Sequence, residues 1–272
     1  MSQVPRTDAS QGLPAGPLGI MEATRMGWRL MRSDFWPLWT VALVEMLILI
    51  GAGMVAGVIA TIVVVPPLAA GMFYVVAKRI DGGRAEVGDL FAGFQKRFGQ
   101  SVVGFLPVSI ASLVFAMLLG AVIGAAFVIS MAVAQEGRGD EGVIVAVAII
   151  AILAVLVIGT ILFIAIEIFI LFFTFVLPAV WDHPESGWAA AKDSARLVRG
   201  RFLSVVGFAL LFLLIGMAAQ LIGTLACCVG GFFTGPVVTV WQSATMIYLY
   251  RSWTGRPLVQ LPAGAVETSP AI

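Results

Sequence analysis

Two acidic residues, Glu45 and Glu167, stand inside long apolar runs of the sequence. An ionisable group in a stretch of membrane-span length is costly, and such groups often belong to a polar site. At 1.5 Å of rise per helical residue, each carboxyl lies roughly 13 to 17 Å from the basic end of its run. The two acids therefore suit one polar cavity at a shared depth. The alternative is that each acid is satisfied locally and only fixes the register of its helix.

Other polar side chains fall on the same apolar runs. Thr160 and Thr174 stand seven residues before and after Glu167, which predicts one polar stripe on an otherwise apolar helix. Gln220 and Gln242 lie on the last two runs and could line the same cavity. A cavity joining these groups would favour a transporter or permease that uses Glu45 or Glu167 in proton or solute coupling.

The sequence holds no arrangement that is typical of catalysis or metal binding. His183 is the single histidine, and one ligand alone makes no metal site. The two cysteines, Cys227 and Cys228, are adjacent and unsuited to an ordinary disulfide. Phosphate-binding glycine loops and nucleophile elbows are absent from the sequence. We therefore expect a protein without enzymatic activity, cofactor or metal ion.

Two sets of basic residues share the i, i+4, i+7 spacing of one helical face: Arg25, Arg29 and Arg32, and Lys192, Arg196 and Arg199. Each set predicts an amphipathic helix that lies along the inner membrane surface, with its apolar side in the acyl boundary. Its cations would then contact anionic headgroups. Alternatively, these helices only anchor the loops and follow the positive-inside tendency. Because the basic residues are divided among membrane-proximal segments, we expect no nucleic-acid-binding face.

The composition is that of a membrane protein, since 60% of the residues are apolar and 11% are charged. A soluble domain is about one-quarter charged. A crossing needs about 20 apolar residues. The sequence therefore predicts an all-α polytopic integral membrane protein with six transmembrane helices, two of them in the first run, which paired prolines divide. The runs are residues 36–77, 102–134, 143–180, 203–229 and 236–250.

The distribution of charge predicts how the chain is oriented. Fifteen of the sixteen Lys and Arg residues lie in four polar segments, and Arg138 is the exception. An even number of crossings places all four segments on one face, and the positive-inside tendency makes that face cytoplasmic. We therefore predict a protein of the bacterial cytoplasmic (inner) membrane with both termini in the cytoplasm.

A pattern repeated three times organises the chain: an amphipathic segment, a crossing, a proline or glycine break and a returning crossing. Phe202 repeats Phe35 at the offset that relates the two basic sets, and residues 204–208 resemble residues 101–105. The predicted six-helix domain covers residues 20–253, in units of about 20–80, 87–182 and 186–253. We expect a disordered cytoplasmic tail at residues 1–19 and a flexible one at residues 254–272.

Small residues recur near four-residue spacing on the outgoing crossings, which lets helix backbones approach closely in lipid. The predicted set is Gly53, Gly57, Ala116, Gly120, Gly124, Ala219 and Gly223. Packing within one chain is the simpler interpretation, and a homo-oligomer interface is the alternative.

Four short motifs carry a resemblance to a known group of proteins. They are Pro-Leu-Ala-Ala-Gly-Met-Phe-Tyr at residues 67–74, Asp-Leu-Phe-Ala-Gly-Phe at 89–94, Leu-Pro-Ala-Val at 177–180 and Gly-Trp-Ala-Ala-Ala-Lys-Asp-Ser at 187–194. With them, residues 20–253 resemble uncharacterised bacterial multi-pass membrane proteins similar to the membrane domain attached to some glycerophosphodiester phosphodiesterases. The resemblance implies a six-helix membrane fold. It implies no catalytic residues, because the hydrolase domain is absent here.

The function that we expect is binding rather than catalysis. The chain would bind anionic membrane lipids or a membrane-protein partner, as a scaffold or an accessory subunit. Transport through the predicted polar cavity is the alternative.

Overall fold

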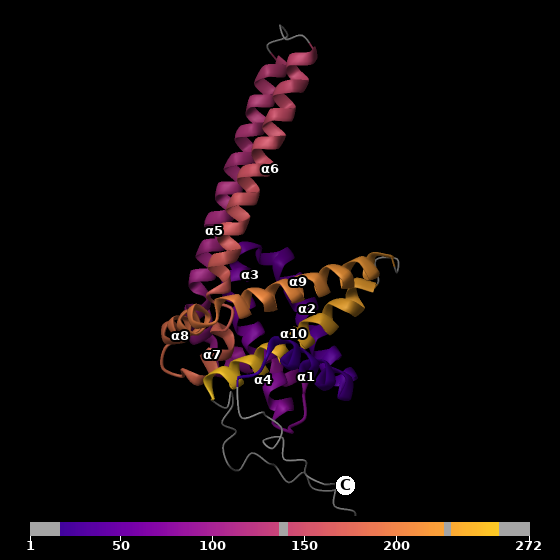
Figure 1. The fold of residues 1–272 in the computed structure, drawn as a ribbon, viewed down its shortest axis with the longest axis vertical. Coiled ribbons are helices and arrows are strands. Elements are labelled where there is room, and N and C mark those ends of the chain that lie inside the picture. Colours follow the sequence, from indigo (N-terminus) through magenta and orange to yellow (C-terminus); the bar gives the residue numbers. More distant parts are fainter. Residues whose placement is uncertain (1–16, 136–140, 226–229, 256–272) are drawn as a thin grey trace, which may run out of the picture. The chain divides into compact units, whose positions relative to one another are not determined.

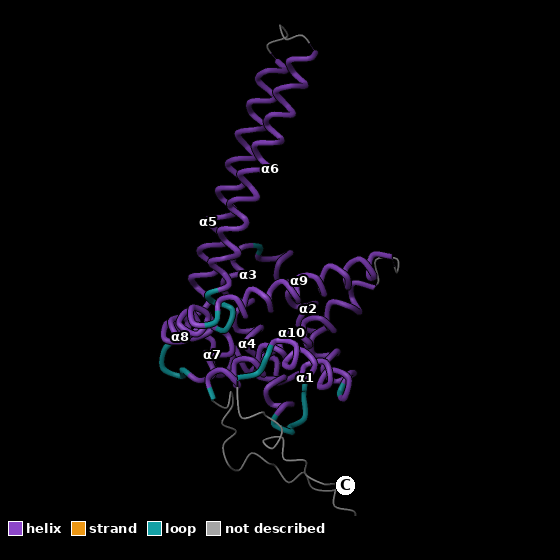
Figure 2. Tube along the Cα trace, in the orientation of Figure 1, coloured by secondary structure: helices purple, strands orange, loops and turns teal. Residues whose placement is uncertain are grey.

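A computed structural model describes residues 17–135, 141–225 and 230–255 of the chain. Within these ranges the regular structure is helical, with no strand (Figure 2). The chain divides into two compact units. We call Met1–Phe105 with Phe173–Ile272 the base unit, and Leu106–Phe172 the hairpin unit. The predicted tails lie almost wholly outside the described residues, as do most of the polar stretch at 135–142 and both cysteines.

The base unit holds most of the helices (Figure 1). They are α1 (Ile20–Ser33), α2 (Phe35–Ala56), α3 (Val58–Val63), α4 (Val65–Ile80), the 3-10 helix η2 (Val87–Phe91), α7 (Val176–Asp182), α8 (Gly187–Gly200), α9 (Phe202–Leu225) and α10 (Gly230–Thr254). Helix α5 (Ala92–Gln135) begins in the base unit and continues into the hairpin unit, which it forms with α6 (Glu141–Leu171).

Four helical stretches of the described chain are long and apolar enough to cross a membrane. They are Phe35–Ala56, Val87–Ala132, Val145–Asp182 and Phe202–Leu225. The predicted helical membrane fold is confirmed to this extent. The predicted returning crossings of the first and third units correspond to α3 with α4, and to α10, which are not among these four. Six crossings and the three-unit repeat therefore remain predictions.

Helix α4 forms the core of the base unit. Pro66 and Pro67 occupy its first turn, where a missing backbone N–H breaks no hydrogen bond. From Leu68 to Ala77 nearly every side chain of α4 is buried. Its backbone contacts η2 and the start of α5, because a Cβ added at Gly71 would collide with the carbonyl oxygen of Leu90. Only glycine fits such a contact, and it joins two of the motifs that carry the family resemblance.

Each outgoing helix of the base unit starts after the same backbone kink. Asp34, Arg97 and Arg201 have φ between −139° and −131° and ψ between 23° and 48°, outside the helical range. A phenylalanine follows each of the three. The kink turns the chain from a short amphipathic helix into a long apolar one.

We call the helices between a kink and the return of the chain to the base unit a helical excursion. Each kink residue also contacts the far end of the excursion that it starts. Arg79, near the end of α4, forms an ion pair with Asp34. The Arg97 guanidinium lies 5.9 Å from the ring centroid of Trp181 in α7. The Arg201 guanidinium lies 5.0 Å from the ring centroid of Trp253 in α10. Each excursion therefore returns to the place in the base unit where it began.

In the hairpin unit, α5 and α6 run side by side (Figure 1). The rings of Phe115 and Phe163 pack across the pair with centroids 6.4 Å apart. Exposed apolar side chains cover most of α5 from Ile110 onward. Residues 110–132 span about 35 Å at the helical rise, close to the hydrocarbon thickness of about 30 Å. The predicted apolar run at residues 102–134 is longer than one crossing requires. Most of its additional residues come before the exposed part.

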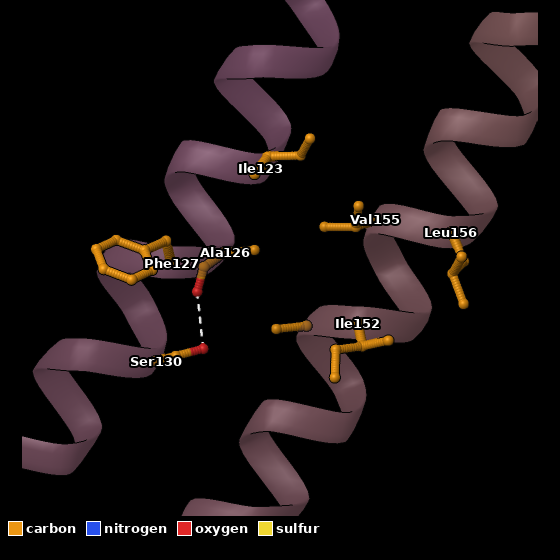
Figure 3. A pocket seen from close by; sticks show the side chains of 8 residues that line it. Ile123, Ala126, Phe127, Ser130, Ile152, Val155 and Leu156 are labelled. Atoms are coloured by element: carbon orange, nitrogen blue, oxygen red, sulfur yellow. Dashed lines mark hydrogen bonds between the residues drawn. The ribbon is translucent and has the colours of Figure 1, made fainter. Parts of the chain in front are cut away.

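A shallow pocket of about 310 Å³ lies between α5 and α6 (Figure 3). Apolar side chains such as Ile123, Phe127 and Val155 line it. The Ser130 hydroxyl donates a hydrogen bond to the Ala126 carbonyl oxygen, 2.8 Å away, and is thereby satisfied within its own helix. With no charge in its lining, this pocket suits acyl chains rather than a polar ligand.

We predict that Gly71→Ala lowers the stability of the protein, because the added methyl group has no room against Leu90. Overpacking of this kind costs roughly 1–3 kcal/mol. The measurement is the midpoint of thermal unfolding in mild detergent, followed by tryptophan fluorescence. Gly99→Ala is the matched control, since no atom lies within 4 Å of a Cβ added there. An equal midpoint for Gly71→Ala and the wild type would contradict the close backbone contact.

Candidate functional site

The amphipathic helix α1 packs antiparallel to α10. The Leu18 N–H donates to Ser252 Oγ over 2.6 Å, and Trp241 Nε1 donates to the Thr24 carbonyl oxygen over 2.8 Å. Ala23, Thr24, Gly27 and Met31 are all buried on this side of α1. A Cβ at Gly27 would lie 2.7 Å from Thr245 Oγ1, so the two backbones are close.

Helix α8 packs on α7 in a similar way. The Ser186 hydroxyl caps its first turn by accepting from the Ala189 N–H. Ala190, Ala191 and Val198 are fully buried, and the hydroxyl of the buried Ser194 accepts from the Phe175 N–H at 3.1 Å. The prediction that the apolar sides of these two helices lie in the acyl boundary is therefore wrong. They are largely covered by protein, although Met21 and Trp28 on α1 and Trp188 on α8 remain exposed.

The opposite sides of the two helices carry the predicted cations. We call Arg25, Arg29 and Arg32 the basic face of α1, and Lys192, Arg196 and Arg199 the basic face of α8. All six side chains are exposed. Of these six side chains, only Arg196 forms an ion pair within the described part of the chain, with Asp193 at 3.1 Å. Five cations are therefore free to contact a partner outside this chain.

A second shallow pocket, of about 350 Å³, lies between α8 and α10. Asp193, Arg196 and Leu197 line it from α8, and Tyr250 and Thr254 line it from α10. We call it the α8–α10 pocket. It combines an exposed guanidinium, a carboxylate and an aromatic ring on two helices of the base unit.

Residues that sequence reasoning did not assign to a site surround this pocket. The Tyr250 hydroxyl donates to Asp182 Oδ2 at 2.6 Å. His183 Nε2 lies 2.8 Å from Asp193 Oδ2, which makes an ion pair when the imidazole is protonated. The sequence suggested only a solvated loop histidine. The usable signal was the short antiparallel turn between α7 and α8, which brings residue 183 beside residue 193.

The returning helices are joined at their C-terminal ends. Arg251 in α10 donates to both carboxylate oxygens of Asp81, which follows α4, at 2.7 Å each. The neighbouring Tyr250 holds Asp182 at the end of α7. The Arg251 side chain is only 9% exposed, so solvent screens this pair weakly. Together these contacts hold the ends of α4, α7 and α10 in fixed positions beneath the α8–α10 pocket.

A second polar contact attaches η2 to α4. Lys78 Nζ donates to both oxygens of Asp89, at 2.8 and 3.0 Å. Burial lowers the pKa of Lys78, but the hydrogen bond and the negative charge of Asp89 outweigh it and raise this pKa above its ordinary value. The ammonium form is therefore stabilised by folding.

The predicted pair of acids is divided between the two units. Glu45 belongs to the base unit, where it is only 5% exposed, and its Oε2 has no hydrogen-bond partner among the described residues. Glu167 belongs to the hairpin unit and is exposed. Neither of the two pockets described above is lined by either acid. A shared cavity thus remains a prediction. Among the described residues, the buried carboxyl of Glu45 is the one observation that favours the transport hypothesis.

The other predicted polar residues are dispersed. Thr160 is exposed and its hydroxyl donates to the Leu156 carbonyl oxygen at 2.7 Å, one turn back in α6. Gln220 is exposed, whereas Gln242 and Thr174 are half-buried. Thr160 is thereby satisfied within α6, and it requires no polar neighbour on another helix.

The small residues predicted for helix packing have different environments. Gly53, Gly120 and Gly124 are exposed, with no atom within 4 Å of an added Cβ. Gly57 has φ +49° and ends α2, so its conformational freedom serves a break in the helix. Gly223 does pack closely, since its Cβ would lie 2.8 Å from the Gly231 backbone nitrogen. Ala116 is exposed, and Ala219 is half-buried.

Comparisons of the chain with protein-family models, with curated proteins and with solved structures give no match. The function is therefore argued from the chemistry of this chain.

We predict that Lys78→Gln destabilises the protein at neutral pH by about 1–2 kcal/mol, because it removes a hydrogen-bonded charge pair. The folded-state pKa of Lys78 is raised, so the stabilisation is complete below the unfolded pKa of about 10.4. It is lost as the pH rises through the raised value. Thermal unfolding from neutral to strongly alkaline pH measures the difference between the variant and the wild type. Arg84→Gln, at an exposed loop residue, is the control. A difference that persists at high pH would show that the charge of Lys78 is not its cause.

Proposed function

We propose that this protein is a non-enzymatic integral membrane protein that binds anionic phospholipid headgroups through the basic faces of α1 and α8. One observation carries the proposal: six exposed cations, five without an ion pair among the described residues, stand on two helices whose other sides are buried in the base unit. A helix fixed in this way presents its cations at constant positions. Anionic lipid supplies the opposite charge.

The surroundings of the basic faces also support a membrane interface. Trp28 and Met21 are exposed on α1, and Trp188 is exposed on α8. Tryptophan is enriched at the level of the headgroups because its ring is apolar and its N–H is polar. A basic residue near an anionic leaflet contributes about 1 kcal/mol of attraction. Six such residues would hold the base unit firmly against the inner leaflet.

The topology that goes with this proposal has six crossings in three repeated units, with both termini in the cytoplasm of a bacterial cell. Its support is the common kink at Asp34, Arg97 and Arg201 and the return of each helical excursion to its own kink. Each amphipathic segment packs on a returning helix: η2 on α4, α8 on α7 and α1 on α10. The first unit thereby packs on the third.

A scaffold or an accessory subunit is the role that such a surface suits. The base unit offers two helices whose charged faces are held in place by their buried sides, which suits contact with lipid and with a neighbouring protein. The family resemblance noted in the sequence, to membrane domains that accompany a separate hydrolase, agrees with this role. A membrane-protein partner would then dock beside the lipid-bound base unit.

Replacing Arg25, Arg29, Lys192 and Arg196 together by glutamine should weaken binding of phosphatidylglycerol at least about tenfold, since each lost charge removes up to about 1 kcal/mol. The measurement is the anisotropy of fluorescent phosphatidylglycerol in mixed micelles, with phosphatidylcholine as the neutral reference. The matched control exchanges the same four residues between arginine and lysine, which keeps the charge and should keep the affinity. Unchanged binding by the glutamine variant would refute the proposal.

Cysteine substitutions at Arg29 and Arg196, in a chain whose own two cysteines are replaced by serine, should stay unlabelled by an impermeant maleimide in intact cells. Both should be labelled after the cells are opened, because six crossings place the two basic faces in the cytoplasm. A cysteine at Gly137, in the polar stretch between the two central runs, is the externally exposed control. Labelling of either basic face from outside would overturn the topology.

A further inference from the structure

We propose that the α8–α10 pocket binds a phospholipid headgroup that carries both a phosphodiester and a primary ammonium group, as in phosphatidylethanolamine. This inference rests on the proposed lipid binding and adds selectivity to it. The basic faces attract any anionic headgroup, whereas this pocket places a cation and an anion of the protein side by side.

The guanidinium of Arg196 is the group that would hold the phosphodiester. Its side chain is 77% exposed, and only Nη1 is engaged, with Asp193 Oδ1 at 3.1 Å. A guanidinium has five N–H donors in a planar fork, so most of them remain for phosphate oxygens. The ion pair with Asp193 orients the guanidinium and leaves its other N–H donors available for the phosphodiester.

The carboxylate of Asp193 is the group that would accept the ammonium. It contacts Arg196 through Oδ1 and His183 through Oδ2. Two carboxylate oxygens offer about four acceptor positions, so further hydrogen bonds can be accepted. The side chain is 35% exposed, which leaves it accessible from the pocket.

Tyr250 forms a buried wall of the pocket, since it is only 3% exposed. Its hydroxyl is held by Asp182, and its ring packs against Phe175 with centroids 6.2 Å apart, so its position is fixed from both sides. It therefore shapes the pocket, and Asp193 is the group that contacts the ammonium. Leu197 supplies an apolar wall beside it.

The same groups disfavour other ligands. Asp193 repels a purely anionic headgroup such as phosphatidylglycerol at this point, although the basic faces attract it. A metal ion is a poor alternative, because no described cluster offers three possible ligands. The combination of Arg196 and Asp193 in one pocket matches a headgroup with both signs of charge joined by a short linker.

The experiment measures binding of short-chain phosphatidylethanolamine, phosphatidylglycerol and phosphatidylcholine to the purified full-length chain in detergent, by isothermal titration calorimetry. Free phosphoethanolamine and inorganic phosphate are titrated in parallel. The variants are Asp193→Asn, Arg196→Gln and Leu197→Trp, the last of which fills the pocket without removing a charge. Glu185→Gln, at an exposed residue just before α8 and outside both the pocket lining and the basic faces, is the matched control.

The wild type and Glu185→Gln should bind phosphatidylethanolamine at least tenfold more tightly than inorganic phosphate, and Leu197→Trp should lose this binding. Asp193→Asn should lose the preference for the amine while phosphate-dependent binding remains. If Asp193→Asn fails to fold, the result for Leu197→Trp decides. Equal binding of phosphoethanolamine and the lipid would keep the pocket but assign it to a soluble ligand.

Wild-type binding of phosphatidylethanolamine no tighter than that of inorganic phosphate, or full binding by Leu197→Trp, would overturn the inference. The proposed function fails separately, in the fluorescent phosphatidylglycerol measurement with the four-residue glutamine variant. If one of the two measurements gives the expected result and the other does not, the outcome separates general electrostatic attraction by the basic faces from selective binding in the pocket.

Discussion

Burial of the apolar sides of α1 and α8 against α10 and α7 is the constraint on which the exposed chemistry of this protein depends. An amphipathic helix that floats in the membrane interface can rotate and slide, and its charges move with it. Here Gly27 lies against Thr245, and Ser194 receives a backbone hydrogen bond from Phe175. These contacts fix the rotation of each helix. The arginines and lysines therefore point outward by elimination, because the protein core has no place for them.

The kinks and ion pairs of the base unit explain how long apolar helices can end in a compact, polar structure. A turn after Asp34, Arg97 and Arg201 separates helices of different character, and each kink residue contacts the end of the excursion that it starts. Arg251 with Asp81 and Tyr250 with Asp182 then join the returning helices to one another. The same contacts that stabilise the base unit position the walls of the α8–α10 pocket, so structure and proposed binding share residues.

Lipid binding and transport make different demands on this chain. Transport needs a continuous polar path across the membrane, and the polar side chains that suggested one are placed differently: Glu45 is buried, Glu167 is exposed and Thr160 is satisfied by its own helix. The proposed lipid binding needs accessible charge, which the exposed basic faces of α1 and α8 supply. The exposed apolar surface of the hairpin unit requires nothing more specific than acyl chains.

Composition and periodicity alone determined that the chain is helical and rich in apolar stretches of membrane-span length, because hydrophobic run length and charge spacing are local properties. The i, i+4, i+7 spacing also determined that Arg25, Arg29 and Arg32 share a face, as do Lys192, Arg196 and Arg199. The tertiary structure decided what covers the other side of α1, since the contacting residues Thr24 and Trp241 are 217 positions apart in sequence. It also decided that Gly71 must be a glycine, because folding brings it against the backbone of Leu90. Those outcomes depend on backbones brought together by packing, which no single stretch of sequence encodes.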